Sequence, residues 1–138
     1  MRLAQKTSVA VKLLALLSSH KNNKYTAEEI ADRLKVSRSL VAQVVMELRR
    51  NHYVTTKTGK HGGISMLKDP QSISLTEIIQ IFEADFALTR CLKHDHDADC
   101  IFPNGCPMKE IFTNALDKFF DVLSKATIDD LLDADFTP

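Results

Sequence analysis

Two short amphipathic segments, separated by a break at Lys35-Val36, constrain the fold of this chain more than any other feature. The first segment opens with Thr26-Ala-Glu-Glu29, which has the spacing of a capping box. In a capping box the hydroxyl accepts a hydrogen bond from the third helical amide, and the carboxylate reaches back to the first residue. The second segment opens at Ser37, a good helix cap, and keeps its apolar residues on one side as far as Leu48. Two short helices joined by a tight turn form a helix-turn-helix.

The residues that follow predict a β-hairpin. The run 52–57 is rich in β-branched residues, as strands are, and residues 64–67 supply the returning strand. Between them, residues 58–63 contain three glycines, which tolerate the positive φ angles of a turn. A helix with apolar spacing over about residues 3–19 precedes the pair. A helix-turn-helix followed by a two-stranded wing is the winged-helix arrangement, so we expect a mainly α fold with a small β-hairpin.

The charged residues are strongly segregated along the chain, although 18 basic and 18 acidic residues cancel overall. Residues 1–69 contain thirteen Lys and Arg and five Asp and Glu, whereas residues 70–138 contain five and thirteen. A basic half suits a polyanion such as double-stranded DNA, and the alternative is two solvated surfaces of opposite sign. We therefore predict a winged-helix DNA-binding domain over 1–69 and a part with a different role over 70–138.

Exposed positions on the second helix of the motif and at the hairpin tip are candidate DNA contacts. Arg matches guanine and Gln matches adenine in the major groove, and a helix N-terminus with its capping serine suits a phosphate. Cations at the tip of the wing can reach phosphates or the minor groove. Each position could instead be ordinary solvated surface. The candidates are Ser37, Arg38, Ser39, Gln43, Lys57, Lys60 and His61.

The acidic half predicts a linker helix, an irregular loop and a long helix. Residues 74–77 form a second capping box, and Thr127-Ile-Asp-Asp130 is a weak cap for a last short helix. After Pro107, apolar residues recur at spacings of three and four over about five turns. These are Met108, Ile111, Phe112, Ala115, Leu116, Phe119, Val122, Leu123 and Ala126. The helix could fold back on its own chain, but we predict a homodimerisation helix, which would match a palindromic operator.

The irregular segment between these helices, residues 84–107, contains all three cysteines of the chain, Cys91, Cys100 and Cys106. A secretory signal and a membrane-spanning run are both missing, so we expect a cytoplasmic protein with no membrane partner. In that compartment an odd set of close cysteines suits a metal or redox site better than disulfides. A soft metal centre, a thiol switch, zinc and no cofactor all remain open. The absence of a phosphate loop or nucleophile motif argues against an enzyme. Besides a DNA-binding regulator and an enzyme, a protein-interaction adaptor is the third class of function that the sequence leaves open.

The chain resembles the Rrf-type regulators, a family with NsrR-like and IscR-like members, over about residues 1–126. The passages that carry the resemblance are the glycine-rich wing, the cysteine triplet, Met1-Arg-Leu3 with Thr7, Lys68-Asp-Pro70 and Ile73-Ser-Leu-Thr-Glu-Ile-Ile79. The resemblance implies a dimeric winged-helix repressor or activator. It also implies an iron–sulfur cluster, 2Fe–2S or 4Fe–4S, on Cys91, Cys100 and Cys106. Such a cluster senses nitric oxide, oxidants or iron–sulfur supply, and it can be absent from isolated protein.

The fourth ligand of such a cluster departs from the family pattern. The triplet resembles NsrR-like members, because Lys109 stands where IscR-like members have a histidine. NsrR-like members imply an aspartate ligand from the partner's first helix, but Ser8 occupies that position and is a poorer ligand. His94 and His96 are the alternatives within the loop, together with its aspartates. A small thiol or water from solution could also complete the shell.

Overall fold

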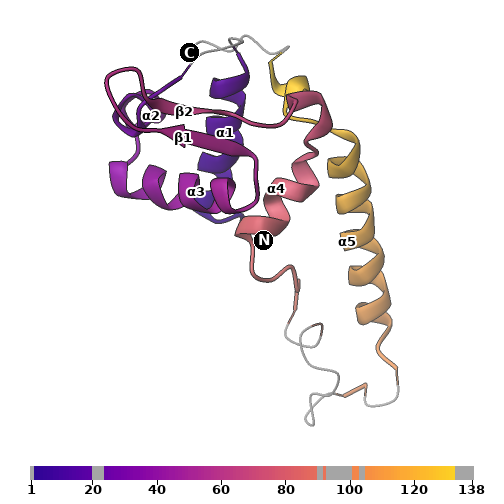
Figure 1. The fold of residues 1–138 in the computed structure, drawn as a ribbon. Coiled ribbons are helices and arrows are strands. Elements are labelled where there is room, and N and C mark those ends of the chain that lie inside the picture. Colours follow the sequence, from indigo (N-terminus) through magenta and orange to yellow (C-terminus); the bar gives the residue numbers. More distant parts are fainter. Residues whose placement is uncertain (1, 20–23, 90–91, 93–100, 103–104, 133–138) are drawn as a thin grey trace.

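The computed structural model describes residues 2–19, 24–89, 92, 101–102 and 105–132. Figure 1 shows a head of packed helices and a hairpin, beside which a long helix extends as an arm. The elements are α1 (Gln5–Ser18), α2 (Ala27–Leu34), α3 (Arg38–Arg50), β1 (Val54–Lys57), β2 (Gly63–Met66), α4 (Leu75–Phe82) and α5 (Pro107–Lys125), with 3-10 turns η1 (Pro70–Ser72) and η3 (Asp129–Leu131). This mainly α architecture with one antiparallel hairpin confirms the predicted fold class. We call the elements from α1 to β2 the head and α5 the arm.

Helix α1 is the centre of the head, because it is apolar on most of its circumference. It packs against α2, α3, α4 and β2. Ala10, Leu13 and Leu14 are completely buried on it. The surrounding helices supply the rest of the core, including Ile30 from α2 and Leu48 from α3. Burial of this apolar area is the main force that holds α3 against the head.

The two caps predicted for the helix-turn-helix are both present. The Thr26 hydroxyl accepts from the Glu29 amide at 3.2 Å, and the Glu29 carboxylate accepts from the Thr26 amide at 2.7 Å. The Ser37 hydroxyl accepts from the Leu40 amide at 3.2 Å. Between the helices Lys35 adopts a left-handed conformation with φ of 53°, which ends α2 and turns the chain toward α3.

The wing is an antiparallel hairpin in which Val54 pairs with Met66 and Lys57 pairs with Gly63. Its return strand is also tied to the start of α2, because Tyr25 and Ile64 exchange two backbone hydrogen bonds of 3.1 and 2.8 Å. The turn needs glycine at position 62, where a Cβ atom would lie 2.2 Å from the Lys57 carbonyl oxygen. Lack of steric room for a Cβ atom, and not a positive φ angle, therefore fixes this glycine.

Residues beyond the wing complete the core of the head. Helix α4 has the predicted capping box, with the Glu77 amide 3.3 Å from the Ser74 hydroxyl and the Ser74 amide 2.9 Å from the Glu77 carboxylate. Ile73, Ile78 and Ile128 are completely buried in the same cluster as the residues of α1 and α3. The Ile128 amide donates to the Ile73 carbonyl at 3.0 Å. The predicted division between residues 69 and 70 stays a prediction, and both sides of it contribute to one core.

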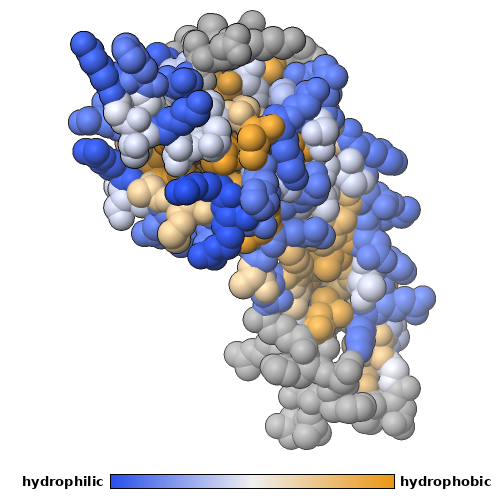
Figure 2. Space-filling model, in the orientation of Figure 1, coloured by the Kyte–Doolittle hydropathy of each residue, from blue (hydrophilic) through white to orange (hydrophobic). Residues whose placement is uncertain are grey.

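The arm begins at Pro107 as predicted and contains no buried residue. Its inner side lies against α4, and Phe120 packs edge-on against Phe86 with ring centroids 4.8 Å apart. Ile111 and Val122 are 63% and 69% exposed on the arm. Figure 2 shows hydrophobic side chains gathered along the arm beside α4. Within the described residues, none of the helices combines the length and apolarity needed to cross a membrane.

Candidate nucleic-acid interface and cysteine segment

The first two turns of α3 expose one face to solvent, because the opposite face of the helix packs against α1. Val41 and Val44 are completely buried, whereas Ser37, Ser39 and Gln43 are exposed. Arg38 is also exposed, as the first residue of the helix. All the candidate DNA contacts predicted on α3 are therefore accessible to a ligand.

Arg38 has an acidic neighbour that sequence reasoning missed. Its guanidinium lies 3.9 Å from the Glu28 carboxylate of α2, and both side chains are about 70% exposed. An ion pair this exposed contributes about 0–1 kcal/mol, so it restrains Arg38 only weakly. Arg38 can exchange this partner for an acceptor on a ligand.

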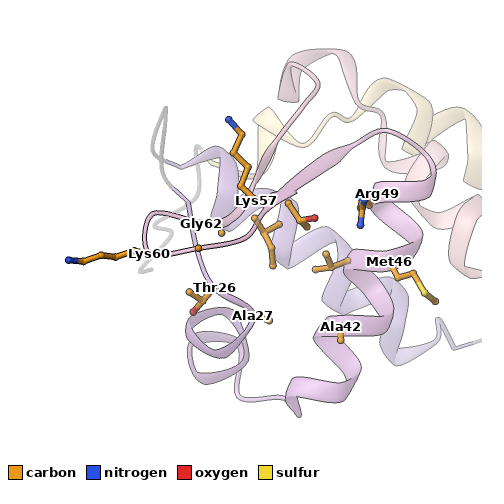
Figure 3. Close-up of a pocket in the computed structure, with 13 residues that line it drawn as sticks. Thr26, Ala27, Ala42, Met46, Arg49, Lys57, Lys60 and Gly62 are labelled. Carbon is orange, nitrogen blue, oxygen red and sulfur yellow. The ribbon is translucent and has the colours of Figure 1, made fainter.

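A groove with a cavity volume of about 520 Å³ separates α3 from the wing. Figure 3 shows Ala42, Met46 and Arg49 of α3 along one side, with Lys57, Lys60 and Gly62 of the wing on the other. Its lining also includes Thr26, Ala27, Val45, Thr56, Gly59, Gly63 and Ile64. Two predicted contacts of the wing, Lys57 and Lys60, therefore line the same groove as residues of α3.

The other predicted contacts do not line this groove. Ser37, Arg38, Ser39 and Gln43 are at the start of α3, and His61 is exposed in the turn of the wing. The contacts predicted from the sequence do not include Met46 or Arg49, although both line the groove. The available signal was helical spacing, because positions 42, 46 and 49 recur at intervals of four and three and share one face.

The end of α4 is tied to the start of α1 by Glu83. The Glu83 carboxylate accepts a hydrogen bond from the Ala4 amide at 2.7 Å and another from the Thr7 hydroxyl. Ala4 stands at the N-cap of α1 and has no side chain that could cap the helix, so Glu83 supplies the acceptor from a distant part of the chain. Thr7 is buried at 1% exposure. An alanine at the N-cap indicates that another group must accept the hydrogen bond, but the sequence does not identify Glu83 as that group.

The cysteine segment is described only in part. Cys106 is half-buried at the N-cap of α5, and its side chain makes no capping hydrogen bond. Ser8 is exposed on the first turns of α1. The other predicted ligands, Cys91, Cys100, His94 and His96, lie outside the described residues, and so does any test of their geometry.

The chemistry of Cys106 fits a soft metal centre, because thiolate sulfur is the ligand that iron–sulfur clusters and zinc prefer. The described residues alone contain no group of three His, Cys, Asp or Glu side chains that could hold a metal ion. A complete site would therefore need the remaining cysteines of the triplet.

Among the residues that the structure describes, three groups have shifted pKa values, two in capping turns and one in the core. The Thr26 amide and hydroxyl lower the pKa of Glu29 by hydrogen bonding, and those of Thr127 lower the pKa of Asp130. Burial, with a smaller effect of Glu77, raises the pKa of Tyr53. The Lys68 ammonium lies 4.0 Å from the centre of the Tyr53 ring, in the geometry of a cation–π contact.

A comparison with known proteins identifies the family. The profile of Rrf2, described as an iron-dependent transcriptional regulator, matches residues 3–134. This chain belongs to the Rrf2 family. It is 31% identical over 133 residues to the HTH-type transcriptional regulator NsrR of Bacillus licheniformis, a match that covers 96% of this chain and 92% of the relative. The predicted resemblance to Rrf-type, NsrR-like regulators is thereby confirmed.

Solved structures of other regulators share the fold of this Rrf2-family protein. IscR of T. potens superposes with a TM-score of 0.78 at 20% identity, over 100% of this chain and 93% of that one. The oxidized form of Staphylococcus aureus CymR superposes with a TM-score of 0.77 at 20% identity, over 99% and 100% of the two chains. At this identity the likeness establishes the fold alone. The family and its relatives establish a transcription regulator, and the prediction of a non-enzymatic protein is confirmed.

Proposed function

We propose that this Rrf2-family protein acts in the cytoplasm as a homodimeric repressor that binds a palindromic operator and senses nitric oxide, redox state or iron–sulfur supply. The observation that carries the DNA-binding part is the groove between α3 and the wing, with Arg49, Lys57 and Lys60 in its lining. The regulator NsrR among its relatives supports the sensory part. The apolar arm, which has no buried residue, supports self-association.

In this proposal α3 enters the major groove of the operator. Arg38 and Gln43 contact base edges, while Ser37 and Ser39 at the helix N-terminus bind a phosphate. The wing then lies over the neighbouring backbone, where Lys57, Lys60 and His61 bind phosphates or enter the minor groove. The basic half of the chain supplies the long-range attraction.

Sensing would act through the segment between α4 and α5. Cys91, Cys100 and Cys106 would hold an iron–sulfur cluster, which would supply iron that is reactive toward nitric oxide or oxidants. Cys106 begins the arm, and Glu83 at the end of α4 holds the first turn of α1. A change in the segment between these two residues would shift the arm relative to the head. In a dimer, that shift would change the spacing of the two reading helices.

Substitutions on α3 and the wing test the DNA-binding part in a gel-shift or fluorescence assay. Arg38→Ala and Gln43→Ala should each weaken specific binding by about 1–3 kcal/mol and relax base preference, if each residue makes a bidentate base contact. Lys60→Ala should weaken binding to all sequences and flatten the salt dependence by about one unit. An Arg38→Ala protein that still distinguishes operator from random DNA as the parent does would contradict the assignment of α3.

A cluster-free thiol switch is the second candidate, favoured by the solved oxidized form of a CymR with the same fold. Serine substitutions of the three cysteines separate the two mechanisms in anaerobically purified protein. A cluster needs all three thiolates, so each substitution should abolish or severely weaken iron and sulfide binding. A disulfide needs two partners, so one of the three substitutions should be nearly silent. Parent protein that binds no iron after anaerobic incubation with iron and sulfide would defeat the cluster and make the thiol switch the leading mechanism.

The fourth ligand is tested by the decay of cluster absorbance in air. Ser8→Asp should slow the decay if the partner's α1 faces the cluster, because a carboxylate is a better ligand than a hydroxyl. If His94 or His96 completes the shell, Ser8→Asp should change little. The matching His94→Ala or His96→Ala variant should then lose the cluster faster than the parent.

A further inference from the structure

The floor of the groove between α3 and the wing is apolar, although Arg49, Lys57 and Lys60 are also in its lining. Met46 is 54% exposed there, Ala42 is exposed beside it, and Val45 lies beneath them at 8% exposure. Figure 3 shows Ala42 and Met46 on consecutive turns of α3, and both residues line the groove. A methionine this exposed contributes little to the core of its own head, and its side chain is accessible to a ligand.

We propose that this apolar floor reads the C5-methyl group of a thymine, with Ala42 and Met46 as specificity-determining residues. The inference rests on the proposed function, in which α3 enters the major groove. In that groove thymine is the base that presents a methyl group, and small apolar side chains are its usual contacts. The groove therefore adds an apolar contact to the polar contacts proposed for Arg38 and Gln43.

Charge complementarity identifies DNA as the occupant of the groove. Arg49, Lys57 and Lys60 line the groove around its apolar floor. Arg49, Lys57 and Lys60 are exposed, so an apolar peptide would gain nothing from them, whereas a duplex places phosphates on both sides of every base edge. An apolar floor bordered by cations thus matches a methyl group flanked by phosphates.

The experiment begins with selection of bound sequences from a random duplex library by the parent protein, prepared in its DNA-binding state. Each thymine of the selected site is then replaced singly by deoxyuridine, which removes the methyl group and keeps every hydrogen-bonding atom. We expect one thymine in each half-site at which this replacement weakens binding about fourfold, the value of one buried methyl-sized group. In the Met46→Ala or Ala42→Gly protein the same replacement should have little effect.

Leu67→Ala is the matched control, because Leu67 is 56% exposed and lies outside the lining of the groove. This variant should keep the full response to deoxyuridine. The inference is overturned if no thymine responds, or if the response persists undiminished in both α3 variants. A selection that enriches no sequence would instead refute the proposed DNA-binding function, and the inference with it.

Discussion

Helix α1 and the arm are both rich in apolar residues, but they differ in how far those residues are buried. The 14 residues of α1 include eight buried ones, whereas the 19 residues of α5 include none. Both patterns indicate a surface that avoids water. The comparison shows that an apolar stripe predicts that a helix packs against protein, but it does not identify whether the partner is the same chain or another one. In α1 the cover is the same chain, and for α5 we propose a second copy.

The largest effect is expected from a cavity in the head. Leu13→Ala should lower the free energy of unfolding by about 2–5 kcal/mol, because Leu13 is completely buried and its neighbours cannot fill the space. Urea unfolding followed by circular dichroism measures the loss. The exposed neighbour Lys12 supplies the control, and Lys12→Ala should change stability by less than about 0.5 kcal/mol. Similar losses in both variants would mean that α1 is not the centre of the core.

The arm should respond mainly in assembly, and its half-buried residues also in their packing against α4. Leu116→Glu should weaken self-association by about 2 kcal/mol, because truncating a central interface residue costs this much and a charge adds a desolvation penalty. Phe112→Glu and Phe119→Glu should behave in the same way. Light scattering at micromolar concentration measures the change, with Lys118→Glu on the exposed side as the control. A parent protein that is monomeric under these conditions would refute the proposed dimer.

The two capping boxes test whether α4 belongs energetically to the head or to the arm. Thr26→Ala and Ser74→Ala should each cost about 1 kcal/mol in urea unfolding, since each removes the acceptor for a helix amide. The Ser74 variant is the informative one, because it lies beyond the predicted boundary at residue 69. If Ser74→Ala leaves the stability of the head unchanged, α4 folds with the arm instead.

The smallest effect concerns acid. Hydrogen bonds from Thr127 lower the pKa of Asp130 in the folded protein below its ordinary value of 3.8. The folded state therefore favours the ionised carboxylate. The stabilisation is present above that value and is lost as the pH falls through the folded-state pKa. Asp130→Asn should reduce the difference in unfolding free energy between neutral pH and about pH 3, and an unchanged difference would exclude this contribution.

Local features of this chain were predictable, whereas contacts between distant segments were not. The caps at Thr26, Ser37 and Ser74 depend on residues three positions apart, and the wing depends on adjacent strands, so the sequence alone specifies them. The Glu83 contact with α1 spans 76 to 79 positions and has no periodic signal. The burial of Ile128 in the core of the head also depends on residues far away in the sequence, so no local pattern predicts it.

The candidate interface divides in the same way. Exposure of Arg38 and Gln43 follows from the period of one helix, and both were predicted. The groove depends on the angle between α3 and the wing, which is fixed by the Tyr25–Ile64 pairing and by packing against α1. Helical spacing places Met46 on the same face of α3 as Ala42 and Arg49, but the tertiary arrangement is what brings that face to the groove.

The position of Ile128 has a consequence for synthesis of the protein on the ribosome. The core of the head includes this residue, which is made after the whole of the cysteine segment and the arm. The head of a nascent chain therefore remains unfinished while these later parts are translated, even though its reading helix is already made. A nonsense mutation within α5 should accordingly yield a fragment that proteases remove, and not a truncated repressor that occupies its operator permanently.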